Sequence, residues 1–103
     1  MRIFISENDK HDGKVLYHQI VHLLHEEKIA GATVLRGIAG FGAKSHMHTS
    51  GLLTLAQSLP VVIEVIDSQQ NIDKILPKIE QIIDDGLITF EDVKAIRYRK
   101  DNG

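Results

Sequence analysis

A glycine-rich stretch, residues 36–52, limits the folds open to this chain more than any other feature. It reads RGIAGFGAKSHMHTSGL, with four glycines and two histidines, and it separates two apolar runs that have the composition of buried strands. Loops of this length are uncommon inside small compact domains, where they are usually functional or disordered. We therefore expect the other residues to form a scaffold that carries this loop.

The length and composition indicate a single domain, residues 1–103, with part of its apolar surface covered by a partner subunit. The net charge of −2 is not gathered into any block, which argues against a nucleic-acid surface. The chain contains no cysteine, so it has no disulfide or thiolate chemistry and suits a reducing compartment. It opens directly on a strand pattern, and no run is as long as a membrane span. We expect a cytoplasmic protein that is not embedded in a membrane.

Alternating or β-branched apolar residues predict four strands, which cover residues 2–6, 32–38, 61–66 and 93–99. A short apolar piece, residues 87–90, precedes the last of them. The run 61–66 is apolar on both faces apart from Glu64, whereas a half-exposed strand alternates more cleanly. Its second face is therefore expected to pack against another subunit.

Apolar residues at helical spacing predict a first helix over residues 14–28, with Asp12 as its N-cap and Gly31 as its stop. A second helix follows it in the chain. Its apolar residues run from Ile72 to Ile83, with Asp67 or Ser68 as the expected cap and residues 84–86 as its end.

Pro77 is expected to kink the second helix rather than divide it, because proline removes one helical hydrogen bond and crowds the preceding turn. The predicted order is β-α-β-β-α-β. This order is typical of an α+β, ferredoxin-like fold, with two helices on one face of a four-stranded antiparallel sheet.

The segment Gly37–Gly42, GIAGFG, is the first candidate site. It is not a dinucleotide fingerprint, since no helix follows at the required offset. Clustered glycines let successive backbone N–H groups point into one concavity and let an anion approach the main chain. The same residues would also suit a turn that only lets the strand leave the sheet sharply, and both interpretations are open.

Arg97 and Arg99 share one face of the last predicted strand, beside Lys100, and form the densest basic spot of the chain. Two guanidinium groups so spaced can bind neighbouring phosphate oxygens. A solvated strand end would have the same pattern.

Histidines form two further candidate groups. His46 and His48, near Lys44, have a spacing that suits a transition metal or a phosphate, but exposed loop histidines would look the same. On the first helix, the spacing i, i+4, i+7 places three imidazoles on one face, which is compatible with a metal site or with a polar surface; they are His18, His22 and His25.

Catalytic patterns are sparse. The chain has no cysteine nucleophile, no G-x-S-x-G and no H-E-x-x-H. Glu64 and Asp67 are a possible carboxylate pair, but no nucleophile lies beside them in the sequence, so structural or capping roles are expected. We expect no enzymatic activity.

Three of these motifs together resemble the PII signalling proteins. They are Gly40-Phe41-Gly42 after the second strand, Asp85-Gly86 before the last apolar segments, and Arg97-Tyr98-Arg99. More closely, the segments GATVLRGIAGFG, LPVVIEVID and EDVKAIRY are similar to the PII-like family of uncharacterised proteins, domain of unknown function 190. The similarity extends over nearly all of the chain.

The resemblance implies a homotrimer with three lateral clefts that bind an adenine nucleotide, ATP, ADP or AMP, as effector and require no cofactor. It implies a long T-loop, about residues 41–59, that controls a partner protein such as a membrane transporter or channel. The nucleotide-binding residues carried over, with Lys44 added as a phosphate donor, are Gly37, Gly40, Phe41, Gly42, Lys44, Gly86, Arg97 and Arg99.

The sequence also departs from the PII pattern. Leu87 replaces the basic residue that follows Asp-Gly, and the loop has no tyrosine for nucleotidylation. Lys44, His46 or His48 would then replace the missing basic side chain. Two rival functions remain: a trimeric metal-ion-binding protein that uses the loop or helix histidines, and a small enzyme at the subunit cleft.

Overall fold

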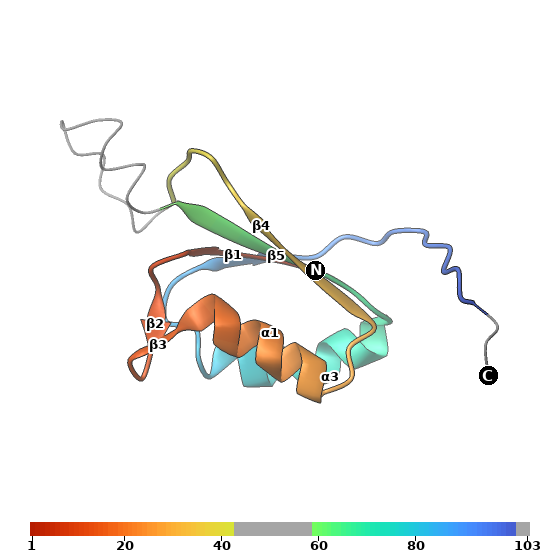
Figure 1. The fold of residues 1–103 in the computed structure, drawn as a ribbon. Helices are drawn as coiled ribbons and strands as arrows, with labels where there is room; N and C mark the ends of the chain where they lie inside the picture. The colour runs from red at the N-terminus through yellow and green to blue at the C-terminus, as the bar shows by residue number, and fades with distance from the viewer. Residues whose placement is uncertain (43–58, 101–103) are drawn as a thin grey trace.

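The computed structural model describes residues 1–42 and 59–100, which form a four-stranded antiparallel sheet with two helices on one face (Figure 1). In chain order the elements are β1 (Arg2–Ser6), β2 (Lys10–His11), β3 (Lys14–Val15), α1 (Leu16–Glu26), β4 (Gly31–Arg36), β5 (Pro60–Ile66), α3 (Gln69–Glu80) and β6 (Leu87–Thr89). The sheet order is β4-β5-β1-β6, and β2 and β3 form a separate pair. The α+β class is confirmed, and the arrangement is compatible with a ferredoxin-like fold. The predicted T-loop, 41–59, lies almost wholly outside the described residues.

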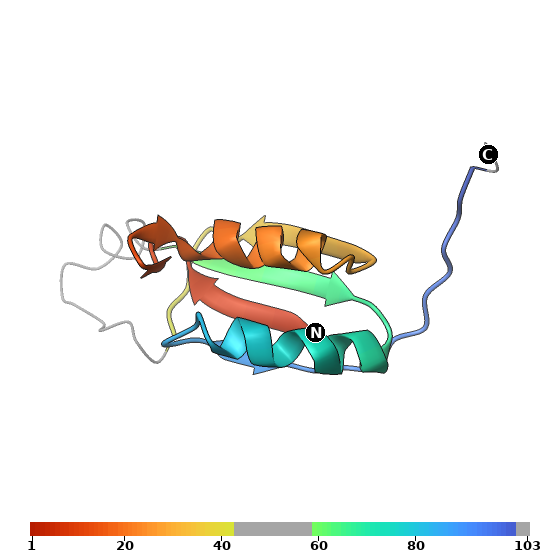
Figure 2. The same cartoon turned by 90° about the horizontal axis from the view of Figure 1, so that it is seen from below.

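The core lies between the sheet and the two helices. Alternate residues of β1 and β5 point toward the helices, and Ile3 and Ile63 at the centre are fully buried. Figure 2 shows α1 and α3 side by side across this face. The buried helix residues repeat every three or four positions, as the amphipathic pattern predicts; they are Leu16, Ile20, Leu24, Ile72, Ile75 and Ile79. None of the helices within residues 1–42 and 59–100 is long and apolar enough to span a membrane.

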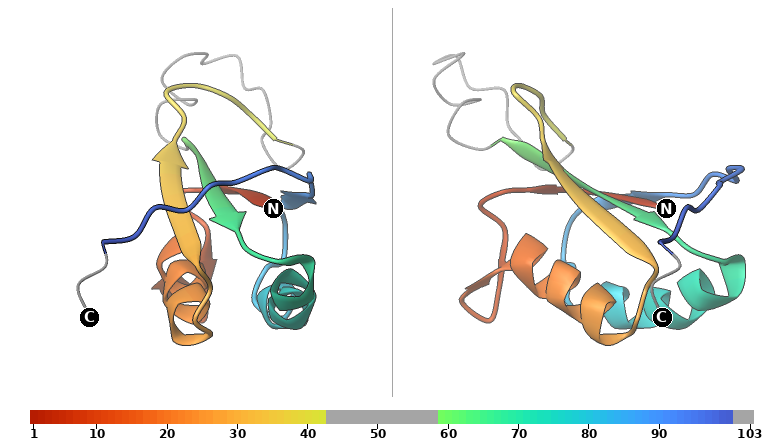
Figure 3. Two further views of the ribbon diagram at one scale, coloured as in Figure 1. Left: turned by 90° about the vertical axis from the view of Figure 1, so that its right-hand side faces the viewer. Right: turned by 45° about the vertical axis from the view of Figure 1, so that its right-hand side comes forward.

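The opposite face of the sheet carries no helix in the described part of the chain (Figure 3). The strand register aligns one apolar row across all four strands, made of Leu35, Val62, Phe4 and Leu87. Leu35 and Leu87 are more than half exposed. The next row is polar, and in it Arg2 Nε lies 3.0 Å from Glu64 Oε2. We call this surface the open face.

The prediction of a last strand over residues 93–99 is wrong. The fourth strand of the sheet is β6, Leu87–Thr89, and Leu87 pairs directly with Phe4. The turn that ends at Gly86 places residues 87–89 directly beside β1. They therefore occupy the edge of the sheet that residues 93–99 were expected to occupy. Residues 90–100 leave the sheet and are exposed.

The predicted ends of the first helix are also wrong. Asp12 is not an N-cap: with φ 51° it forms, together with Gly13 at φ 78°, the turn between β2 and β3. Two successive residues at positive φ suit the two-residue hairpin turns that Asp-Gly favours. At the other end α1 stops at Glu26, Lys28 adopts φ 60°, and Gly31 begins β4.

The second helix begins as expected. Ser68 is the N-cap of α3, and its Oγ accepts a hydrogen bond from Asn71 N at 3.2 Å. Pro77 lies inside α3, so the segment is one helix. The helix ends at Glu80, four residues before the predicted stop at 84–86.

The side chain of Asp67 links the residue before β4 to the first turn of α3. Its carboxylate accepts hydrogen bonds from Ala30 N at 2.8 Å, from Asn71 Nδ2 at 2.9 Å and from Ser68 N. Partial burial alone would raise the pKa of Asp67, but the hydrogen bonds from these donors outweigh it and hold the pKa below its usual value. A lowered carboxyl pKa stabilises the fold above the pKa of the unfolded chain, and this stabilisation is lost as the pH falls through the folded pKa.

Asp67→Asn is therefore expected to lower the free energy of unfolding by about 1–2 kcal/mol at pH 7. The difference from wild type should shrink as the pH falls below about 4, where the wild-type carboxylate is itself protonated. Urea unfolding followed by circular dichroism from pH 7 to pH 3 measures both values. A difference that stays constant over this range would contradict a role for the charge.

Candidate functional site

The glycine-rich segment begins where β4 ends, and it packs against Pro60. Gly37 N donates to Pro60 O at 2.8 Å, which extends the pairing of β4 with β5 by one residue. A Cβ on Gly37 would lie 2.7 Å from Pro60 Cγ, and one on Gly40, which has φ +152°, would lie 3.2 Å from it. Both positions therefore require glycine, and the chain follows the proline ring closely.

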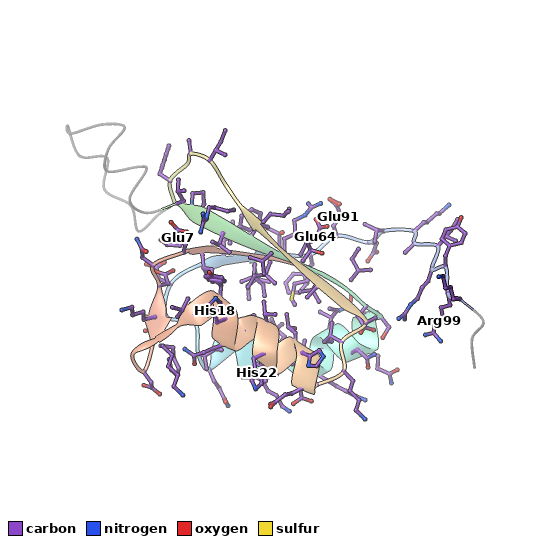
Figure 4. All side chains as sticks on the ribbon, viewed as in Figure 1. Glu7, His18, His22, Glu64, Glu91 and Arg99 are labelled. Atoms are coloured by element: carbon purple, nitrogen blue, oxygen red, sulfur yellow. The ribbon has the colours of Figure 1, made fainter. Side chains whose placement is uncertain are left out.

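An ion pair holds the base of this segment. Arg36 Nε lies 2.9 Å from Glu7 Oε2, and the Glu7 side chain is mostly buried. Glu7 N also donates to Leu59 O at 2.9 Å, so the residue after β1 contacts both strands that lead into and out of the loop. Figure 4 shows Glu7 at this end of the sheet. Nothing in the sequence pattern indicated this pair, because its partners are far apart in the chain.

Gly86 lies at the same end of the sheet as Gly37. A Cβ on Gly86 would lie 3.0 Å from both Phe4 O and Ile5 Cγ2, and Ile5 is paired with Val61 beside Pro60. Two strands separate the two glycine positions, a distance of about 14 Å at the usual strand spacing. The structure thus brings three predicted site residues, Gly37, Gly40 and Gly86, to one end of the sheet. We call this the glycine end.

Other predicted site residues lie elsewhere. Arg97 and Arg99 are exposed on the segment that leaves the far end of β6, and Figure 4 places Arg99 on the opposite side of the molecule from Glu7. Within one chain they do not meet the glycine end. Phe41 and Gly42 are exposed at the edge of the described residues. The predictions for Lys44, His46 and His48 fall outside the described residues.

The three helix histidines line a shallow groove between α1 and β4. Tyr17, Val21 and Val34 complete it, so the groove is partly apolar. His22 Nε2 lies 2.9 Å from Glu26 Oε1, the acidic residue one turn further along the helix. Among the residues that the structure describes, no three His, Cys, Asp or Glu side chains are arranged to hold a metal ion. A metal site formed by His18, His22 and His25 finds no support in this geometry.

The two acidic residues considered for catalysis have structural partners. Glu64 pairs with Arg2 on the open face, where this hydrogen bond, its charge and the charge of Glu91 raise the pKa of Arg2. Asp67 binds the backbone and amide donors described above. Both carboxylates therefore stabilise the fold, as expected.

The family of the chain follows from comparison with known sequences. The family model DUF190, described as an uncharacterized ACR, matches residues 1–95. A UPF0166 protein of Aquifex aeolicus is 41% identical over 96 residues, which cover 93% of this chain and 90% of that protein. A UPF0166 protein of Methanocaldococcus jannaschii is 38% identical over 93 residues, which cover 89% and 85%. The chain therefore belongs to the DUF190 family.

Proposed function

We propose that this protein is a PII-like regulator that binds an adenine nucleotide at the glycine end of its sheet and controls a partner protein through residues 41–59. One observation carries the proposal: Gly37, Gly40 and Gly86, which come from distant parts of the sequence, lie at the same end of the sheet. Glycines so placed leave the main chain open to close approach by a ligand.

The nucleotide needs cations for its phosphates. At the glycine end of the described chain, the guanidinium of Arg36 is already paired with Glu7. Arg97 and Arg99 are exposed and have no acidic partner among the described residues that would compete with a phosphate. They therefore bind the phosphates at the glycine end of a neighbouring copy, and the site is shared between two subunits.

Assembly as a homotrimer creates three such sites. The exposed apolar row of the open face, which includes Leu35 and Leu87, supplies surface that a partner subunit would cover. In the assembled protein the nucleotide alters the conformation of residues 41–59, which engage or release a target such as a transporter or channel. The protein acts in the cytoplasm and catalyses no reaction.

A thermal-shift series with AMP, ADP and ATP tests nucleotide binding. A ligand that binds only the folded protein stabilises it by about 2.7 kcal/mol at a concentration of 100 times its dissociation constant. We expect at least one of the three to raise the melting temperature in a concentration-dependent way, while GTP raises it less. If none raises it at millimolar concentration, the proposal fails.

The double variant Arg97→Ala, Arg99→Ala is expected to weaken nucleotide binding about 10- to 100-fold, since hydrogen bonds to charged groups contribute about 1.5–3 kcal/mol each and the exposed pair is partly screened. Isothermal titration calorimetry measures the affinity. Lys94→Ala, an exposed cation in the same segment, is the matched control and should bind as wild type does. Equal affinities for the double variant and this control would exclude the two arginines from the site.

A further inference from the structure

The ion pair of Glu7 with Arg36 joins two side chains of unequal exposure. Arg36 Nε lies 2.9 Å from Glu7 Oε2, yet the side chain of Arg36 is 63% exposed and that of Glu7 only 20%. The backbone of Glu7 is also fixed, because its N–H donates to Leu59 O at 2.9 Å. A solute can therefore reach the cationic partner of this pair, while the anionic partner is held within the fold.

Arg36 is the last residue of β4, and Gly37 follows it at the glycine end. Gly37 N donates to Pro60 O at 2.8 Å, which fixes the backbone just after Arg36 to β5. In the strand register Arg36 itself is aligned with Val61. The guanidinium is thus anchored one residue away from the main chain that the glycines leave open to a ligand.

The chemistry of a guanidinium allows two kinds of partner at this place. It carries five N–H donors in a planar fork, which matches two oxygen atoms of a carboxylate or of a phosphate. A phosphate monoester carries about −1.5 to −2 charges at pH 7, against −1 for a carboxylate. Within residues 1–42 and 59–100 the acidic partner of Arg36 is Glu7 alone. Glu7 and a phosphate are therefore alternative partners for the same exposed side chain.

We propose that Arg36 is a phosphate-binding residue of the glycine end and that Glu7 competes with the ligand for it. In the ligand-free protein the guanidinium is bound to Glu7, and when the ligand binds, the guanidinium exchanges this carboxylate for a phosphate group. The inference deepens the proposed function, on which it rests for a ligand that brings a phosphate to the glycine end.

The burial of Glu7 makes this competition effective. A carboxylate that is mostly removed from water is costly to leave without its cation, because its charge is then poorly solvated. Each binding event has to separate the pair, so Glu7 lowers the affinity for the ligand. A neutral side chain of the same shape at this position would not impose this cost.

Glu7→Gln tests the competition. Glutamine keeps the shape of the side chain and can still accept a hydrogen bond from Arg36, but it carries no charge. With the adenine nucleotide that gives the largest thermal shift, we expect isothermal titration calorimetry to show an affinity about 3- to 10-fold above that of wild type. Glu27→Gln is the matched control, since Glu27 pairs with Lys78 and lies near the start of β4, away from Arg36. If Glu7→Gln binds no more tightly than this control, the inference is wrong.

Arg36→Ala tests the phosphate contact itself. We expect it to weaken nucleotide binding about 10-fold, because the ligand loses a charged donor and meets the unpaired carboxylate of Glu7. Arg36→Lys keeps the charge without the planar fork and should give an intermediate affinity. Circular dichroism shows whether each variant is folded. A folded Arg36→Ala with wild-type affinity would overturn the inference.

Nuclear magnetic resonance of the wild-type protein provides a test that needs no substitution. The Nε–H signal of Arg36, assigned through bonds, should move when the nucleotide binds. Arg2 is the internal reference, because its Nε pairs with Glu64 Oε2 at 3.0 Å in the same way. It lies at the start of β1, about 13 Å along the strand from Ser6 at the glycine end. If the Arg36 signal moves no more than the Arg2 signal at saturation, Arg36 does not bind the ligand.

Inorganic tripolyphosphate, used as a second probe, distinguishes failure of this inference from failure of the proposed function. If no adenine nucleotide binds, but tripolyphosphate moves the Arg36 signal and binds more tightly to Glu7→Gln, the inference holds and the proposed function is wrong. If an adenine nucleotide binds equally well to wild type, Glu7→Gln and Arg36→Ala, the proposed function holds and the inference is wrong. If neither ligand binds, both are wrong.

Discussion

Ile63→Ala is expected to lower the free energy of unfolding by about 2–5 kcal/mol, the range for removing a large aliphatic side chain from a core. Ile63 is fully buried at the centre of β5, between β4 and β1, and faces the helices. The free energy of unfolding of native proteins is only about 5–15 kcal/mol, so this substitution would remove a large part of it. Urea unfolding followed by circular dichroism gives the value.

Val62→Ala is the matched control on the same strand. Its side chain points to the open face and is only half-buried in the single chain, so the loss should be smaller, about 1 kcal/mol. A loss as large as that of Ile63→Ala would show that a partner covers the open face. A loss below about 0.5 kcal/mol for Ile63→Ala itself would contradict the described core.

Gly37→Ala should have the largest effect on the candidate site. The added Cβ would lie 2.7 Å from Pro60 Cγ, closer than such atoms approach in proteins, and a proline ring has little freedom to move aside. We expect a loss of about 1–3 kcal/mol in stability. Displacement of the loop base should also reduce any nucleotide-induced thermal shift. Melting curves with and without nucleotide measure both effects.

Gly31→Ala and Gly42→Ala are the controls for the stability effect of this substitution, and Gly31→Ala alone is the control for the nucleotide-induced shift, because Gly42 is itself a predicted nucleotide-binding residue. A Cβ at either position meets no atom within 4 Å, and neither glycine has a strained φ. Both variants should be as stable as wild type or gain up to about 1 kcal/mol, because alanine restricts the unfolded chain. If Gly37→Ala behaves as Gly31→Ala does, the close packing on Pro60 is not a constraint.

Local patterns predicted most of the scaffold. Apolar alternation identified the buried faces of β1 and β5, and the helical spacing identified the residues that cover them, because burial depends directly on these periodicities. Ser68 was identifiable as a cap since its side chain acts on a neighbouring residue. The family assignment was confirmed too, whereas the relation to PII proteins stays a prediction.

The errors arose where non-local contacts decide the structure. Val93–Arg99 alternates like a strand, but Leu87–Thr89 comes earlier in the chain and takes the place beside β1. Asp12 has the residue type of a helix N-cap, but together with Gly13 it forms a hairpin turn. The dipeptide Asp-Gly is typical of such turns and could have predicted this one. The pairing of Arg36 with Glu7 had no signal in the sequence, since only the folded sheet brings them together.

The hydrogen bonds at the base of the glycine-rich segment also affect how the chain tolerates insertions. Gly37 N to Pro60 O and Glu7 N to Leu59 O fix the two points between which the intervening residues run. For a loop whose two ends are fixed, each doubling of its length adds only about 0.6 kcal/mol of closure entropy. Residues can therefore be added or exchanged between these points at little cost to the core. The scaffold therefore places little constraint on the length of the connecting segment.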